Sequence, residues 1–160
     1  MCGIFAVINK SQKLDINKCR KSLNSLNKRG PDWKIEKVIN DKVFLGQAVL
    51  SMTGEKKKNI NQHYSVTKNF FVLLVGEIYN YKKLSDENLG GLDINLTSDT
   101  KILANLFEKK TINEVNTDID GMYAYILFDQ KKNNLLISRD PNGEKSLYVY
   151  QNSKEIIISS

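Results

Sequence analysis

Short apolar runs separated by turn residues dominate the pattern of hydrophobic and polar positions along the chain. Residues 3–8 (GIFAVI) form the first run and predict a buried strand. Apolar residues then recur at helical spacing from Ile16 to Leu26, which predicts an amphipathic helix of about three turns that ends before Arg29-Gly30-Pro31. Cys19 falls on the apolar stripe of this helix and is interpreted as a small core residue.

The next segments predict strands joined by polar connections. Residues 38–39 and 43–50 are apolar and flank Asn40-Asp41, a pair typical of a hairpin turn. Residues 54–64 are polar and predict a loop. Residues 70–75 (FFVLLV) form a continuous apolar run, so we expect a buried strand that stops at the following glycine.

The second half of the chain predicts one helix and then several strands. Ser98 or Asp99 can cap a helix. Its apolar face would comprise Ile102, Leu103, Leu106 and Phe107. Four strand-like runs follow, separated by turns, and predict an antiparallel meander: residues 122–128, 135–137, 147–150 and 156–158. The chain shows no internal repeat and no linker, so residues 1–160 are expected to form a single domain of the α+β class with largely antiparallel sheets.

Composition narrows the class of protein. The chain has 160 residues, of which 41% are hydrophobic and 26% charged, as in a soluble globular domain. No apolar run approaches the roughly 20 residues of a membrane helix, and the first residues lack the pattern of a secretory leader. Cys2 and Cys19 are too few for a disulfide scaffold or a structural zinc site. We therefore expect a reduced, cytoplasmic protein without a metal or another cofactor.

The charge balance adds little to this picture. Lys and Arg number 24 against 18 Asp and Glu, which gives a net charge of +6, but the only arginines are Arg20, Arg29 and Arg139. Specific readers of nucleic acid favour arginine for its planar fork, so we expect no nucleic-acid partner. The dense run Lys56-Lys57-Lys58 is interpreted as a solvated surface.

Cys2 is the first candidate for chemistry. Removal of Met1 would leave its thiol beside a free α-amine with an ordinary pKa near 8, so one residue would carry both a nucleophile and a base. Gly3 would let a substrate approach the backbone closely. By itself, a cysteine at the second position is usually inert. A Cys–His pair is not the alternative, since the only histidine, His63, lies in a polar loop.

Three further segments allow a functional and a purely structural interpretation. Gly76-Glu77 follows a buried strand, where a backbone N–H could serve an oxyanion, although the segment could also be a simple turn. Asp99 on its own is a helix cap. Arg29 in Arg-Gly-Pro-Asp either terminates a helix or donates hydrogen bonds to backbone or carboxylate groups near Cys2.

Taken together, these pieces resemble one family over nearly the whole chain. The matching segments are MCGIFAV at 1–7, RGPDW at 29–33, GEIYNYKKL at 76–84, SDTKIL at 98–103, DGMYAYILFD at 120–129 and SRDPNGEKSLYVY at 138–150. The chain resembles the class II glutamine amidotransferase domain, with an N-terminal nucleophile, closest to the glutaminase half of asparagine synthetase. The resemblance implies a four-layer αββα sandwich of antiparallel sheets, of the N-terminal-nucleophile hydrolase type.

The resemblance also implies roles for individual residues. Cys2 would attack the side-chain amide of glutamine and release glutamate and ammonia, with its own amine as the base. Gly76 would donate to the oxyanion, and Glu77 and Asp99 would hold the α-amino group of glutamine. The substrate-binding positions would further include Val49, Leu50 and Ser51, while Arg29 and Asp32 would support the site. Ammonia would then pass to a separate synthetase domain or chain, which is the partner we expect besides glutamine.

Two residues depart from the family's pattern. The family has Leu-Gly-His-x-Arg-Leu-Ser-Ile where this chain has LGQAVLSM at 45–52, so Val49 replaces the arginine that grips the α-carboxylate of glutamine. The family's Asn-Gly-Glu is Val75-Gly76-Glu77 here, which removes a side-chain donor to the oxyanion. Loss of one such donor typically costs about 10²–10³ in rate, and loss of a charged partner roughly 2–5 kcal/mol of binding. A smaller change is Ser146, where the family commonly has proline.

Two hypotheses follow. The chain is either a glutamine-hydrolysing domain, impaired by Val49 and Val75, or a non-catalytic module of the same fold that binds a partner or another ligand. We expect it to lack the final strands of the family's domain and any synthetase domain, since the resemblance would continue beyond Ser160. If the first hypothesis holds, Cys2, Gly76, Glu77 and Asp99 should converge on one cleft, with Val49 and Val75 facing it.

Overall fold

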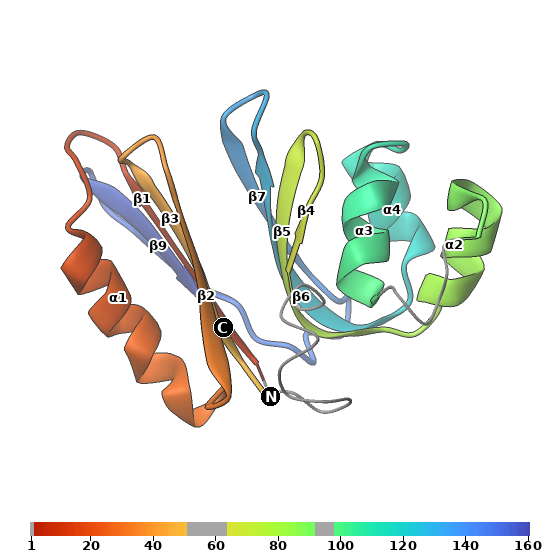
Figure 1. Cartoon of the computed structure of the whole chain (residues 1–160), viewed down its shortest axis with the longest axis horizontal. Helices are drawn as coiled ribbons and strands as arrows, with labels where there is room; N and C mark the ends of the chain where they lie inside the picture. Colours follow the sequence, from red (N-terminus) through yellow and green to blue (C-terminus); the bar gives the residue numbers. More distant parts are fainter. Residues whose placement is uncertain (1, 51–63, 92–97) are drawn as a thin grey trace. The chain divides into compact units, whose positions relative to one another are not determined.

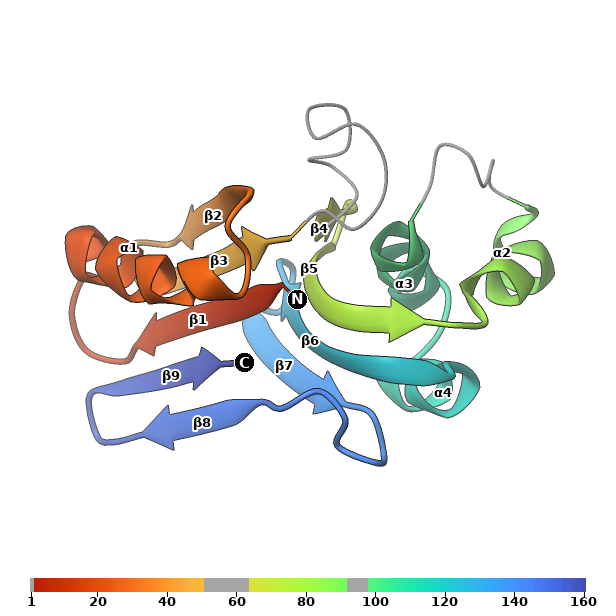
Figure 2. The same ribbon diagram turned by 90° about the horizontal axis from the view of Figure 1, so that it is seen from below.

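The computed structural model describes residues 2–50, 64–91 and 98–160, and it divides the chain into two compact units. The first unit combines Met1–Lys56 with Ser146–Ser160, and the second is Lys57–Lys145. Each unit contains one antiparallel sheet with helices on one of its faces (Figures 1 and 2).

The described residues form strands and short helices. In order they are β1 (Gly3–Asn9), α1 (Ile16–Ser25), a 3₁₀ turn η1 (Leu26–Lys28), β2 (Trp33–Ile39), β3 (Val43–Val49), β4 (Tyr64–Val66), β5 (Phe70–Ile78), α2 (Tyr81–Leu89), α3 (Asp99–Phe107), α4 (Ile112–Asp118), β6 (Gly121–Asp129), β7 (Asn134–Arg139), β8 (Tyr148–Gln151) and β9 (Glu155–Ser159).

The sheet of the first unit has the strand order β2-β3-β1-β9-β8, and α1 covers part of one face. The helix begins as predicted at Ile16, where the side chain of Asp15 accepts a hydrogen bond from the Lys18 amide. Cys19 and Leu23 of the helix pack against Phe5, Val7 and Phe44 of β1 and β3. The prediction that Cys19 belongs to the core is confirmed.

The predicted hairpin around Asn40-Asp41 is also confirmed. Both residues have φ of +54°, and they connect β2 to β3, which pair antiparallel from Ile39↔Val43 to Trp33↔Val49. Two consecutive positive φ values are typical of a type I′ turn, which Asn and Asp tolerate better than most residues. This hairpin carries Val49 to the end of β3 that lies beside the start of β1.

The sheet of the second unit has the order β4-β5-β6-β7, with α2, α3 and α4 on one face (Figure 1). Helix α3 begins after Ser98, whose side chain accepts from the Lys101 amide at 3.3 Å, as predicted for the cap. The predicted apolar face of this helix is buried: Ile102, Leu103, Leu106 and Phe107. These side chains pack against alternate residues of β5 and β6, which form the core of the unit.

Two expectations about the strands are wrong. Strand β5 does not stop at Gly76 but continues to Ile78, because Gly76 adopts φ of +105° and keeps pairing with β6. The four C-terminal strands do not form one meander. Strands β6 and β7 pair in the second unit, whereas β8 and β9 return to the first, where β9 pairs with β1.

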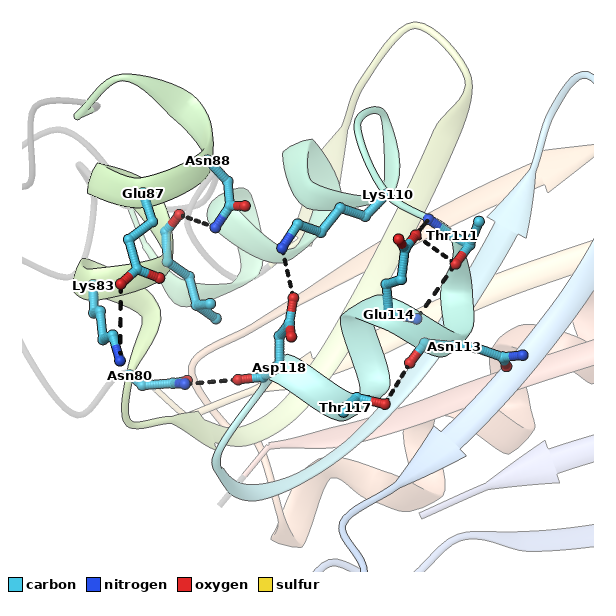
Figure 3. A network of polar contacts seen from close by, with 11 residues as sticks. Asn80, Lys83, Glu87, Asn88, Lys110, Thr111, Asn113, Glu114, Thr117 and Asp118 are labelled. Atoms are coloured by element: carbon cyan, nitrogen blue, oxygen red, sulfur yellow. Dashed lines mark hydrogen bonds and ion pairs between the residues drawn. The ribbon is translucent and has the colours of Figure 1, made fainter.

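Sequence patterns missed three elements: β4, α2 and α4. The α4 signal was nevertheless present, since Thr111 and Glu114 form a capping box in which each side chain accepts from the other residue's amide (Figure 3). The predicted polar loop at 54–64 lies outside the described residues except for Tyr64, and so do His63 and the lysine run at 56–58. None of the described helices has the length and apolar character needed to cross a membrane.

Candidate active site

The thiol of Cys2 lies at the end of strand β3. Its Sγ accepts a hydrogen bond from the Leu50 amide at 3.4 Å and lies 3.6 Å from the carbonyl oxygen of Leu50. The pairing of β1 with β3, which begins at Gly3↔Ala48, produces this proximity between residues 48 positions apart. Cys2 is half-buried and is not in a disulfide, so the sulfur is held in place and remains a thiol.

The segment Arg29–Asp32 packs across the same end of β3. Arg29 Nε donates a hydrogen bond to the carbonyl oxygen of Cys2 at 3.3 Å, the kind of contact expected for this arginine. The amide of Asp32 donates to the Val49 carbonyl at 3.0 Å. Gly30 lies so close to β3 that a Cβ added there would be 2.2 Å from the Ala48 carbonyl oxygen. Cys2 is therefore anchored through its backbone by the turn that follows α1.

The ends of β5 and β6 approach each other unusually closely in the second unit. A Cβ on Gly76 would lie 1.9 Å from the Met122 carbonyl oxygen, and a Cβ on Gly121 would lie 2.1 Å from the Glu77 carbonyl oxygen. Both residues have positive φ, of +105° and +157°. Only glycine fits at either position, and the backbone geometry around Gly76-Glu77 depends on this close approach.

Asp99 contacts the same end of β5. It is the first residue of α3, and its Oδ2 accepts from the Ile78 amide at 3.2 Å while its Oδ1 accepts from the Thr100 amide at 2.7 Å. Burial raises the pKa of the Asp99 carboxyl, and the negative charge of nearby Glu77 raises that pKa further, against the lowering effect of the backbone donors. Glu77 itself is exposed. Two carboxylates from distant segments therefore lie near each other at the end of β5.

The predicted site residues fall into two groups. Cys2, Arg29, Asp32, Val49 and Leu50 lie together in the first unit. The second group, Val75, Gly76, Glu77 and Asp99, lies together in the second unit. Ser51 lies outside the described residues. The convergence of both groups on one cleft stays a prediction.

A cavity of about 300 Å³ in the first unit involves none of these residues. It lies between α1 and the sheet, with Phe5, Val7, Cys19 and Ile157 among its lining side chains. Across the described residues, no group of three or more His, Cys, Asp or Glu side chains is arranged to hold a metal ion. The first group of residues offers a thiol that can act as a nucleophile, and the second offers carboxylates that can bind a cation.

Sequence reasoning missed Gly121 and Asn80 as members of this arrangement. Gly121 lies in the quoted segment at 120–129, and a glycine at the start of a predicted strand signals a close backbone approach. Asn80 lies in the quoted segment at 76–84, just before a helix that the apolar pattern did not reveal. The residue types, a glycine and an asparagine, were the signals from which a role for these two positions could have been predicted.

Comparisons with known proteins identify the family of this chain. Residues 1–160 match the family described as "Glutamine amidotransferase domain". The chain is 30% identical to a probable glutamine-hydrolysing asparagine synthetase of Acanthamoeba polyphaga mimivirus, covering 99% of this chain and 29% of that protein. It is also 30% identical to asparagine synthetase 2 of Bacillus subtilis (strain 168), covering 100% of this chain and 21% of that protein. The chain thus spans only a fifth to a third of these relatives.

Among solved structures, glutamine phosphoribosylpyrophosphate amidotransferase from B. subtilis is similar over 99% of this chain and 41% of that one, with a TM-score of 0.75 and 17% sequence identity. This likeness shows the fold and confirms the predicted α+β class, with antiparallel sheets of the N-terminal-nucleophile hydrolase type. Because the family match extends over the full length of the sequence, the chain belongs to the glutamine amidotransferase domain family, and the curated relatives named above are asparagine synthetases.

Proposed function

We propose that this domain hydrolyses glutamine to glutamate and ammonia, with Cys2 as the nucleophile. After removal of Met1, the α-amine of Cys2 takes the thiol proton, and the sulfur attacks the side-chain amide carbon of glutamine. The C–N bond breaks, ammonia leaves with that proton, and a γ-glutamyl thioester remains on the sulfur. Water then cleaves the thioester, which releases glutamate and restores the thiol.

The observation that carries this proposal is the placement of the Cys2 sulfur. Its Sγ lies 3.4 Å from the Leu50 amide, and the Cys2 carbonyl accepts from Arg29 Nε. Both contacts hold the first residue of the mature chain without using its α-amine, which stays available as a base. A held nucleophile with an adjacent base loses little entropy on reaching the attacking geometry.

The second unit supplies groups suited to the other end of the substrate. Glu77 and Asp99 are carboxylates near the end of β5, and a pair of negative charges suits the α-ammonium group of glutamine. Gly76 offers a backbone N–H beside them for the oxyanion. In this proposal, the two groups of residues act on one bound glutamine.

A second candidate function rests on Val49 and Val75. Both are apolar where the family carries an arginine and an asparagine, so the grip on the α-carboxylate and one oxyanion donor are absent. The alternative is a non-catalytic module of this fold that binds a partner or a ligand other than glutamine. If glutamine is still hydrolysed, we expect a slow reaction with weak substrate binding.

The ammonia acceptor is expected in a separate synthetase domain or chain. The asparagine synthetases to which the chain is similar are several times longer, and the chain matches only a part of each. Ammonia formed here would be used by that synthetase unit.

The test combines intact mass with an assay of glutamine hydrolysis. Mass spectrometry establishes whether Met1 is removed, and glutamate and ammonia are then measured in equal amounts from glutamine. We expect Cys2→Ala to abolish the reaction, while Cys19→Ala, which changes the other cysteine, retains it. Absence of hydrolysis by a folded chain with a free Cys2 amine would favour the non-catalytic module instead.

A further inference from the structure

The side chain of Asn80 continues the hydrogen-bond ladder between β5 and β6 beyond its last residue pair. That pair is Ile78↔Gly121, and the Tyr79 amide then donates to the Asp120 carbonyl at 2.7 Å. Beyond Tyr79 the chain turns from β5 into α2. The side chain of Asn80 then takes the place of a backbone carbonyl of β5 as hydrogen-bond acceptor. Asn80 Oδ1 accepts from the Asp120 amide at 3.0 Å.

The other half of the Asn80 amide is used as well. Its Nδ2 donates to the Asp118 carbonyl at 2.8 Å (Figure 3). A carboxamide carries the donor and the acceptor of a peptide group, so Asn80 can replace one peptide of the ladder on both counts. Asparagine before a helix normally uses its side chain to cap that helix, but Asn80 makes no such cap bond to α2. Its side chain instead forms hydrogen bonds with the backbone of Asp118 and Asp120, which lead into β6.

The segment that Asn80 contacts is itself anchored. Asp118 ends α4, and its Oδ2 pairs with Lys110 Nζ at 2.6 Å (Figure 3). This ion pair is partly buried and joins the end of α4 to Lys110, which follows α3. Asn80 therefore connects the loop after β5 to a fixed part of the unit.

The residues held by this connection are those proposed to bind the ammonium group of glutamine. Glu77 lies three residues before Asn80, and the Ile78 amide between them donates to Asp99 Oδ2 at 3.2 Å. Gly76 and Gly121 allow the two strand ends to approach closely, so we expect a shift of the loop to change the positions of these groups. We propose that Asn80 is a positioning residue that sets the geometry of Glu77 and Asp99 for the substrate's ammonium group; this inference rests on the proposed function.

The test compares Asn80→Ala with Asn88→Ala in the full chain. Asn88 is a matched control, since its Nδ2 donates to the Leu84 carbonyl at 3.0 Å within α2 and not to β6 (Figure 3). Because the affected groups bind glutamine without reacting, we expect Asn80→Ala to raise KM for glutamine about tenfold with kcat within about twofold. Asn88→Ala should change neither constant. A fall in kcat with unchanged KM would overturn the assignment.

A second measurement does not depend on activity. Hydrogen exchange of the Tyr79 and Asp120 amides should become faster in Asn80→Ala and stay unchanged in Asn88→Ala. Asn80→Asp retains the acceptor but loses the donor, so it should keep the Asp120 amide protected while KM still rises; it also serves if Asn80→Ala does not fold.

The two measurements separate the ways in which the inference can fail. Unchanged exchange in Asn80→Ala would show that the side chain does not hold the loop. If the unaltered protein neither binds nor hydrolyses glutamine, the proposed function is wrong, and the role of Asn80 in that reaction falls with it. If glutamine is hydrolysed and Asn80→Ala has the same KM, only the positioning role is wrong.

Discussion

Arg29 donates a hydrogen bond from its Nε to the carbonyl oxygen of Cys2 over 3.3 Å, so the turn after α1 holds the residue that immediately precedes strand β1. The contact is made to the backbone and leaves the thiol free for its own contact with the Leu50 amide. The next residue, Gly30, lies so close to β3 that a Cβ there would be 2.2 Å from the Ala48 carbonyl oxygen.

Replacing Arg29 should therefore affect both stability and the proposed reaction. We expect Arg29→Ala to lower the free energy of unfolding by about 1–3 kcal/mol, as for a hydrogen bond from a charged donor, and to slow glutamine hydrolysis. Chemical denaturation and the ammonia assay measure the two effects. Arg20→Ala is the control, since Arg20 forms an exposed pair with Glu36 and should change little. Equal losses of stability and activity in the two variants would show that the hydrogen bond from Arg29 to Cys2 contributes to neither.

The close approach of β5 and β6 predicts a graded response to alanine substitutions at glycine. Gly76→Ala and Gly121→Ala place a Cβ within 1.9 and 2.1 Å of a carbonyl oxygen, so the strands must separate. We expect each to lower the free energy of unfolding by more than about 2 kcal/mol. Gly90 also has positive φ, of +73°, but open space around it, so Gly90→Ala should cost only about 1–2 kcal/mol. Urea denaturation ranks the three variants, and a Gly90→Ala effect as large as the others would contradict the packing argument.

Two substitutions should restore groups that the family's site contains. Val49→Arg offers a bidentate fork to the α-carboxylate of glutamine, and Val75→Asn offers a donor to the oxyanion. Because these groups touch different parts of the substrate, Val49→Arg should mainly lower KM and Val75→Asn should mainly raise kcat. Ammonia release is measured for the unaltered protein, both single variants and the double variant, after mass spectrometry has established that Met1 is absent.

The same series can refute the interpretation of the two valines. Brisk turnover by the unaltered protein would mean that neither valine impairs the site. A folded, processed double variant without activity would mean that other differences account for the loss.

The burial of Asp99 predicts a pH dependence of substrate binding. Burial raises the pKa of its carboxyl, and binding of an ammonium group requires the ionised form, so KM should rise as the pH falls through this raised pKa. Asp99→Asn should have a high KM that depends less on pH. Glu77→Gln should keep the pH dependence, since Asp99 is intact in that variant. A KM for the unaltered protein that is flat from neutral pH down to the ordinary range of aspartate would contradict this role.

Stability should respond to pH in the opposite direction. A carboxyl whose pKa is higher in the folded than in the unfolded state binds its proton more tightly when folded. The contribution of Asp99 to stability is therefore fully present below the unfolded pKa and is lost as the pH rises through the folded pKa. Denaturation of the unaltered protein and of Asp99→Asn at several pH values isolates this contribution.

The sequence by itself determined most of the local structure and the family. Apolar spacing identified α1 and α3, and the Asn40-Asp41 turn identified the β2–β3 hairpin, because these depend on residues close together in the chain. The quoted motifs identified the amidotransferase family and named Cys2, Glu77 and Asp99 as candidates. Helices α2 and α4 escaped the pattern because both are short and carry few buried apolar residues.

Only the tertiary structure decided which distant segments meet. The return of β9 to pair with β1, the contact of Asp99 with Ile78, and the hold of Arg29 on Cys2 join residues 20 or more positions apart. Gly76 reads as the end of a strand in the sequence, yet the strand continues through it because the partner strand lies close enough to require a glycine. Local propensity cannot encode such contacts, since each depends on the register and approach of two backbones that are far apart along the chain.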